Sequence, residues 1–239
     1  MKEFLLHVIP VTSVELLAAC IGLFYIINYK VNKPTRYFTY FLLFTVLVEV
    51  IGSYAAIAYF SDYKYFGFVK GTLFEENYWL YNSYTIISSF VYVSFFKMHL
   101  ENANHRKILT ILLILFVVGM VFESVFSETF FVSYSAYGEM IGTLLILLSI
   151  SLYYYQLLTG DEILIFNTSL PFYISIGAIL LHLVLTPIFI YSKYFDAESP
   201  EFVELYKRIL LFTNLLVYLL YSFGFIICLK KKDSSSYIL

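Results

Sequence analysis

The chain has 239 residues, of which 61% are hydrophobic, 21% are aromatic and only 13% are charged, with a formal net charge of -2. A soluble domain of this length cannot hide so much apolar surface in one core. The sequence has no basic patch interleaved with aromatic residues, which excludes a nucleic-acid-binding class. The composition therefore indicates a membrane protein with the lipid bilayer as its main partner.

Seven apolar stretches are each long enough to cross a bilayer as a helix. A transmembrane helix needs about 20 largely apolar residues, whereas strands of a membrane barrel are about half as long and alternate in polarity. The seven predicted spans cover residues 8–29, 37–60, 78–96, 108–126, 137–158, 166–191 and 205–229. The loops between them are short and hold no Gly/Ser-rich linker. The sequence therefore predicts one all-α membrane domain over residues 1–239, a seven-helix bundle.

The basic residues favour one orientation of this bundle. Six lie in the N-terminal segment and in the loops on its side of the membrane, and nine lie on the other side. The nine are Lys30, Lys33, Arg36, Lys97, Arg106, Lys107, Lys230, Lys231 and Lys232. Because cytoplasmic loops carry the excess of Lys and Arg, we expect the N-terminus outside and the C-terminus in the cytoplasm.

Two prolines interrupt the predicted sixth span, 166–191. Pro171 and Pro187 both fall within it. A proline inside a helix removes a backbone hydrogen bond and kinks the helix. The sequence therefore predicts a bent sixth span, which is a candidate moving element.

Polar side chains occur inside the spans, where a bilayer makes them costly. The candidate site residues are Glu15, Glu49, Asn82, Glu139, His182, Asn214 and Tyr218. Glu49 lies near mid-span, where a charged carboxylate costs about 3 kcal/mol and therefore needs a proton, a hydrogen bond or water. By depth, the acidic residues lie from the midplane outward. They predict an outward-facing ligand pocket whose floor lies near Glu49 and His182, or else a purely structural hydrogen-bond network.

Several activities lack the residues that they require. A retinal-binding protein needs a lysine in the body of the seventh helix, but Lys207 and Arg208 stand only at its start. His182 is the only histidine inside a span, so no three-ligand zinc site can be assembled. There is no Gly-x-Ser-x-Gly nucleophile and no glycine-rich phosphate loop. No catalytic residue, metal or cofactor is predicted, and an enzyme is the less favoured class.

Four short motifs carry a resemblance to a known group of proteins. They are Asn77-Tyr78-Trp79-Leu80-Tyr81-Asn82, Gly138-Glu139, Tyr155-Gln156-Leu157-Leu158 and Asn214-Leu215-Leu216-Val217-Tyr218. With these motifs the whole chain resembles uncharacterised bacterial seven-transmembrane-helix proteins, whose genes often lie near two-component sensor kinases. The resemblance implies a multi-pass protein of the bacterial inner membrane with a role in sensing or partner regulation. It assigns no catalytic residues.

Three functions remain open from the sequence. The first is a sensor or regulatory subunit that binds a small-molecule or lipid ligand and acts through a membrane-bound signalling partner. The second is a proton-coupled carrier of small molecules or lipids, with Glu49 and His182 as the titrating pair. The third and least favoured is a lipid-modifying enzyme, with Glu49 or Glu139 as base and His182 as acid.

Overall fold

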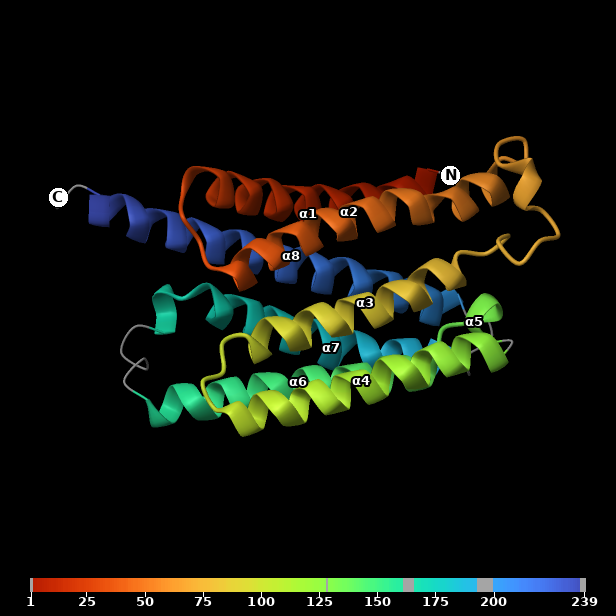
Figure 1. Ribbon diagram of the computed structural model, residues 1–239. Coiled ribbons are helices and arrows are strands. Elements are labelled where there is room, and N and C mark those ends of the chain that lie inside the picture. Colours follow the sequence, from red (N-terminus) through yellow and green to blue (C-terminus); the bar gives the residue numbers. More distant parts are fainter. Residues whose placement is uncertain (1, 128, 161–165, 193–199, 237–239) are drawn as a thin grey trace.

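The computed structural model describes residues 2–127, 129–160, 166–192 and 200–236, which form helices and connecting loops without a β-strand (Figure 1). The elements in chain order are α1 (Lys2–Asn28), α2 (Lys33–Phe60), the 3-10 helix η1 (Gly67–Val69), α3 (Tyr78–Lys97), α4 (Ala103–Phe126), α5 (Thr129–Val132), α6 (Ala136–Thr159), α7 (Leu170–Ser192) and α8 (Pro200–Ser236). Each of the seven predicted spans coincides with one of the long helices, and α5 and η1 were not predicted.

Six of the long helices in the described part of the chain are long and apolar enough to cross a membrane. They are α1, α2, α4, α6, α7 and α8. The chain therefore has the build of a multi-pass membrane protein. Helix α3 has the length of a span but not the apolar composition, because Asn82, Ser88 and Ser89 lie on it. A seventh crossing by α3 stays a prediction.

The packing of the helices closes a ring. Helix α1 lies between α2 and α8, α2 contacts α3, α3 contacts α6, α6 contacts α7, and α7 contacts α8 (Figure 1). Helix α4 packs outside this ring against α3 and α6. Helix α3 is therefore covered by α2, α4, α5 and α6. Protein neighbours rather than solvent surround it, which explains how it can carry so many polar side chains.

Helix α7 starts later than the sequence predicted. It begins at Leu170, so Pro171 lies in its first turn and only Pro187 lies inside the helix. A proline in the first turn removes no helical hydrogen bond, because the first amides of a helix have no acceptor in it. The predicted kink at Pro171 is therefore wrong.

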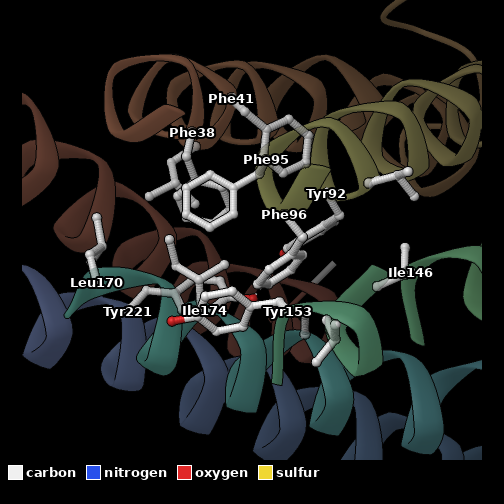
Figure 2. Close-up of a cluster of buried hydrophobic side chains, with 14 of the residues drawn as sticks. Phe38, Phe41, Tyr92, Phe95, Phe96, Ile146, Tyr153, Leu170, Ile174 and Tyr221 are labelled. Carbon is white, nitrogen blue, oxygen red and sulfur yellow. Dashed lines mark hydrogen bonds between the residues drawn. The ribbon is translucent and has the colours of Figure 1, made fainter. Parts of the chain in front are cut away.

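An aromatic cluster fills the middle of the ring (Figure 2). The ring centroid of Phe38 lies 5.2 Å from that of Phe95 and 5.4 Å from that of Tyr221. The hydroxyl groups of Tyr92 and Tyr221 form a hydrogen bond of 2.9 Å. All four side chains are at most 2% exposed. We call these four residues, which contact one another within the buried core of the bundle, the aromatic layer.

Two glycines let α7 and α8 approach closely. A Cβ at Gly177 would overlap the Tyr221 ring, and one at Gly224 would lie 2.7 Å from the Tyr173 Cβ. Each helix thus presents a glycine to a tyrosine of the other. Such close approach of backbones is how helices gain packing energy in a bilayer, where lipid is as apolar as the protein.

We predict that Gly177→Ala lowers the thermal stability of the purified protein. Overpacking of this kind costs about 1–3 kcal/mol, here because the new methyl group meets the buried Tyr221 ring. Gly119→Ala on α4 is the matched control, since no atom lies within 4 Å of its added Cβ. Melting curves in detergent measure both variants. Equal melting temperatures for Gly177→Ala and the wild type would contradict the proposed packing.

Candidate functional site

A cavity of about 520 Å³ lies inside the ring, toward the end where α2 finishes and α3 begins. Residues of α1, α2, α3, α6, α7 and α8 line it, as do Asn77 and Tyr134 from the connecting segments. Its wall holds three carboxyl groups, those of Glu15, Glu49 and Glu139, and we call it the carboxyl cavity. The other polar lining residues are Thr12, Thr45, Asn77, Tyr81, Tyr84, Thr85, Ser88, Ser89, Tyr134, Thr143, His182, Thr186, Tyr206, Lys207, Asn214 and Tyr218.

Glu15 and Glu49 form a pair across the contact between α1 and α2. Their carboxyl groups are close enough for their charges to repel, and the Tyr218 side chain lies within interaction range of Glu15. The Tyr81 hydroxyl donates a hydrogen bond of 3.2 Å to Oε2 of Glu49. Glu15 is 2% exposed, and its Oε2 atom is buried with no hydrogen-bond partner in the described part of the chain.

Glu139 stands on another wall of the same cavity, in the first turn of α6. The Thr85 hydroxyl donates a hydrogen bond of 2.6 Å to Oε1 of Glu139. The Tyr134 side chain lies near both Glu49 and Glu139. The cavity thus has two acidic regions, one at the Glu15–Glu49 pair and one at Glu139.

His182 of α7 lies against two threonines. Its Nδ1 atom is 3.4 Å from the Thr143 hydroxyl, which is itself 2.6 Å from the Thr186 hydroxyl. The ring of Tyr92 meets the imidazole edge-on at 5.5 Å. The Nε2 atom of His182 is buried and has no partner among the described residues. One ring nitrogen of this cavity-lining histidine is therefore left without a hydrogen bond in the described structure.

Helix α8 adds an amide and a phenol. Asn214 Nδ2 donates a hydrogen bond of 2.8 Å to the Leu210 carbonyl of its own helix. Tyr218 is 4% exposed. Six of the seven predicted site residues therefore line this one cavity: Glu15, Glu49, Glu139, His182, Asn214 and Tyr218.

Asn82, the seventh predicted residue, does not line the cavity. Its Nδ2 donates hydrogen bonds of 2.9 Å to the carbonyls of both Phe130 and Ser133, and its Oδ1 accepts one of 3.0 Å from the Ser135 amide. It is 2% exposed. These bonds attach the segment around α5 to α3. Asn82 therefore stabilises this contact and does not face the cavity.

Most of the lining residues were not among the sequence candidates, and Tyr84, Tyr134, Tyr206 and Lys207 are examples. Tyr84 shares a hydrogen bond of 2.9 Å with Thr45 and stacks on Phe41 at 5.9 Å. Tyrosines near span ends are ordinary interfacial residues, so nothing in their spacing marked them. The nearest signal in the sequence is that Thr45 precedes Glu49 by four residues, a spacing that places both on one face of a helix.

The loop between α2 and α3 borders the cavity through Asn77, next to Phe60 at the end of α2. The Asn77 side chain donates a hydrogen bond of 2.9 Å to the Gly52 carbonyl, and the Tyr54 hydroxyl donates one of 2.6 Å to the Phe74 carbonyl. Farther out, Glu75 accepts hydrogen bonds from the Tyr63 hydroxyl and the Gly71 amide, which hold the pKa of Glu75 below its usual value. The loop is thus bonded to α2 and to itself.

A second cavity, of about 540 Å³, lies at the opposite end of the bundle. Lys30 and Lys231 line it, and we call it the lysine cavity. The Lys231 ammonium donates a hydrogen bond of 2.9 Å to the Thr168 hydroxyl. On α8, Tyr218 lines one cavity, Lys231 lines the other, and Tyr221 of the aromatic layer lies between them. The aromatic layer therefore separates the two cavities.

The lysine cavity also has polar walls without lysine. Gln156 joins them, since its Nε2 donates a hydrogen bond of 3.0 Å to the His99 carbonyl and its Oε1 accepts one of 2.7 Å from the Glu101 amide. Burial lowers the pKa of His99 below its usual value. The imidazole is therefore neutral at physiological pH, and the charged lining residues are Lys30, Lys231 and Glu101.

The described residues contain no group of three or more His, Cys, Asp or Glu side chains that could hold a metal ion. Comparisons with protein-family models, with curated proteins and with solved structures give no match. The chemistry of the site therefore has to be inferred from its own residues.

We predict that Asn82→Asp destabilises the protein more than Asn82→Ala does. Alanine loses three hydrogen bonds and leaves buried backbone groups unpaired, at about 1–3 kcal/mol for each such group. Aspartate in addition points an acceptor at the two carbonyls of Phe130 and Ser133. Hydrogen exchange should rise in residues 129–135 of both variants. Unchanged exchange there would contradict the structural role of Asn82.

Proposed function

We propose that this chain is a membrane-embedded sensor or regulatory subunit that binds a small ligand in the carboxyl cavity and acts through a membrane-bound partner. The observation that carries the proposal is the convergence of polar residues from six helices on one cavity. Its volume of about 520 Å³ lies within the range of small-molecule sites, about 300–1,000 Å³. The resemblance to proteins encoded near sensor kinases supports the choice of partner.

In this proposal α3 is the seventh membrane crossing, in the bacterial inner membrane. The carboxyl cavity then opens to the outside and the lysine cavity to the cytoplasm. The position of Lys30 and Lys231 at the latter end agrees with the excess of basic residues on cytoplasmic faces. A partner would meet the bundle at that end.

Helices α3 and α8 connect the two ends. Helix α3 carries Thr85 in the carboxyl cavity and Tyr92 in the aromatic layer. Helix α8 likewise carries Tyr218 in the carboxyl cavity and Tyr221 in the aromatic layer. The Tyr92–Tyr221 hydrogen bond joins the two helices at mid-height. A ligand shifts such a pair of helices only if it binds two arrangements of them unequally. A ligand in the carboxyl cavity would contact Tyr218 of α8, and this contact would differ between the two arrangements of the helices.

We predict that deletion of the gene changes transcription in its own organism and that the purified protein brings down a histidine kinase. Complementation with Glu49→Gln should leave the kinase bound but lose the transcriptional response, because the cavity is changed and the other end is not. Glu76→Gln, an exposed loop residue outside the cavity, is the control. Unaltered transcription together with purification free of any partner would refute the sensor.

A proton-coupled carrier is the second candidate, and a separate observation favours it. The two cavities lie at opposite ends of the bundle, and the buried core that contains the aromatic layer lies between them. Opening of that layer toward either end would give alternating access to one site, as carriers require. Glu49 and His182, the titrating pair predicted from the sequence, both line the carboxyl cavity, and Glu15 and Glu139 add two further carboxyl groups to its wall.

We predict for a carrier that protein in liposomes moves protons when a transported solute is added. The measurement uses a pH-sensitive dye inside the liposomes and a panel of amines, amino acids and short-chain acids outside. Glu49→Gln should abolish the solute-driven signal, whereas Glu76→Gln should not. A signal that persists in Glu49→Gln, or none with any solute, would count against transport.

A further inference from the structure

We infer that the carboxyl cavity binds an organic cation with an apolar body. This inference rests on the proposed function in one respect, namely that the cavity is a ligand site. It adds the chemical class of the ligand, which follows from the charges, the unfilled hydrogen-bond acceptors and the ring faces of the cavity wall.

The charge of the wall favours a cation. Three carboxyl groups line the cavity, against one lysine, Lys207, and one histidine, His182. Within the described ranges the one ion pair joins Arg208 to Glu204 at the surface, so none of the three carboxyl groups has a cationic partner there. Buried charges are stable when paired. A bound cation would supply the missing partner.

The hydrogen bonds of the wall point the same way. Glu49 accepts one bond from Tyr81, and Glu139 accepts one from Thr85. Oε2 of Glu15 is buried and accepts none from the described residues. A carboxylate has about four lone-pair positions, so these bonds leave acceptor positions of the three carboxyl groups unfilled. A ligand that donates hydrogen bonds fits this wall, whereas a ligand that carries a carboxylate would be repelled by the carboxyl groups of the wall.

The remaining lining suits the body of such a ligand. Aromatic rings attract a cation placed over their faces, and tyrosine is a good partner of this kind. Five tyrosines and two phenylalanines line the cavity: Tyr81, Tyr84, Tyr134, Tyr206, Tyr218, Phe60 and Phe189. Leu181, Leu185, Leu210 and Leu211 form an apolar region on α7 and α8. The charged end of the ligand would lie at the Glu15–Glu49 pair and its apolar body against these leucines.

The test uses three probes of nearly equal shape and different charge: phenethylamine (cationic), 2-phenylethanol (neutral) and phenylacetate (anionic). Each is titrated into the full-length protein in nanodiscs, with heat of binding and melting temperature as readouts. We expect phenethylamine to bind and to raise the melting temperature, and the other two to bind at least about tenfold more weakly, as expected for the loss of one charged hydrogen bond.

Variants locate the binding. Glu15→Gln and Glu49→Gln should each weaken phenethylamine binding by about tenfold or more, while Glu76→Gln leaves it unchanged. Glu49→Asp keeps the charge and should retain most of the affinity, which separates loss of charge from loss of folding. Equal or better binding of 2-phenylethanol or phenylacetate would overturn the cation inference and leave the ligand site standing. Failure of all three probes to bind would overturn the inference and the proposed ligand site together.

Discussion

The absence of water from the bilayer interior is the constraint on which the arrangement of this protein depends. Polar groups in hydrocarbon are costly, so they must turn toward protein or toward a water-filled space. The result is visible within three residues of α1: Glu15 is 2% exposed, whereas Leu16 and Leu17 are 47% and 45% exposed. The closed ring of six helices provides the interior toward which such side chains turn.

Within that ring, the aromatic layer decides where polar groups can gather. Phe38, Tyr92, Phe95 and Tyr221 fill the middle, so the polar space divides into one cavity at each end. Their packing depends in turn on the close approach of α7 and α8, which Gly177 permits by leaving room for the Tyr221 ring. Gly177, which does not line the carboxyl cavity, thus helps to set the packing of the aromatic layer.

The sequence predicted the long helices well, because span length and apolar composition follow directly from bilayer thickness. It also predicted that Glu15, Glu49 and His182 belong to one end and the middle of the bundle, since depth follows from position along a span. Which way a side chain turns was harder. Tyr81 and Asn82 are adjacent, yet one faces Glu49 and the other holds the segment around α5. That difference depends on contacts about 50 residues away in the chain, which spacing within one helix does not contain.

Two polar atoms of cavity-lining residues lack hydrogen-bond partners among the described residues, which bears on the alternative that these residues form a purely structural network. A buried network that only stabilises the fold is favourable when every member is satisfied, and a partly satisfied one costs more than an apolar core. The bonds from Tyr81 to Glu49 and from Thr85 to Glu139 fit such a network. The buried Oε2 of Glu15 and Nε2 of His182 do not, since neither has a partner among the described residues. Both atoms belong to residues that line the cavity, so a bound ligand accounts for their presence better than stability does.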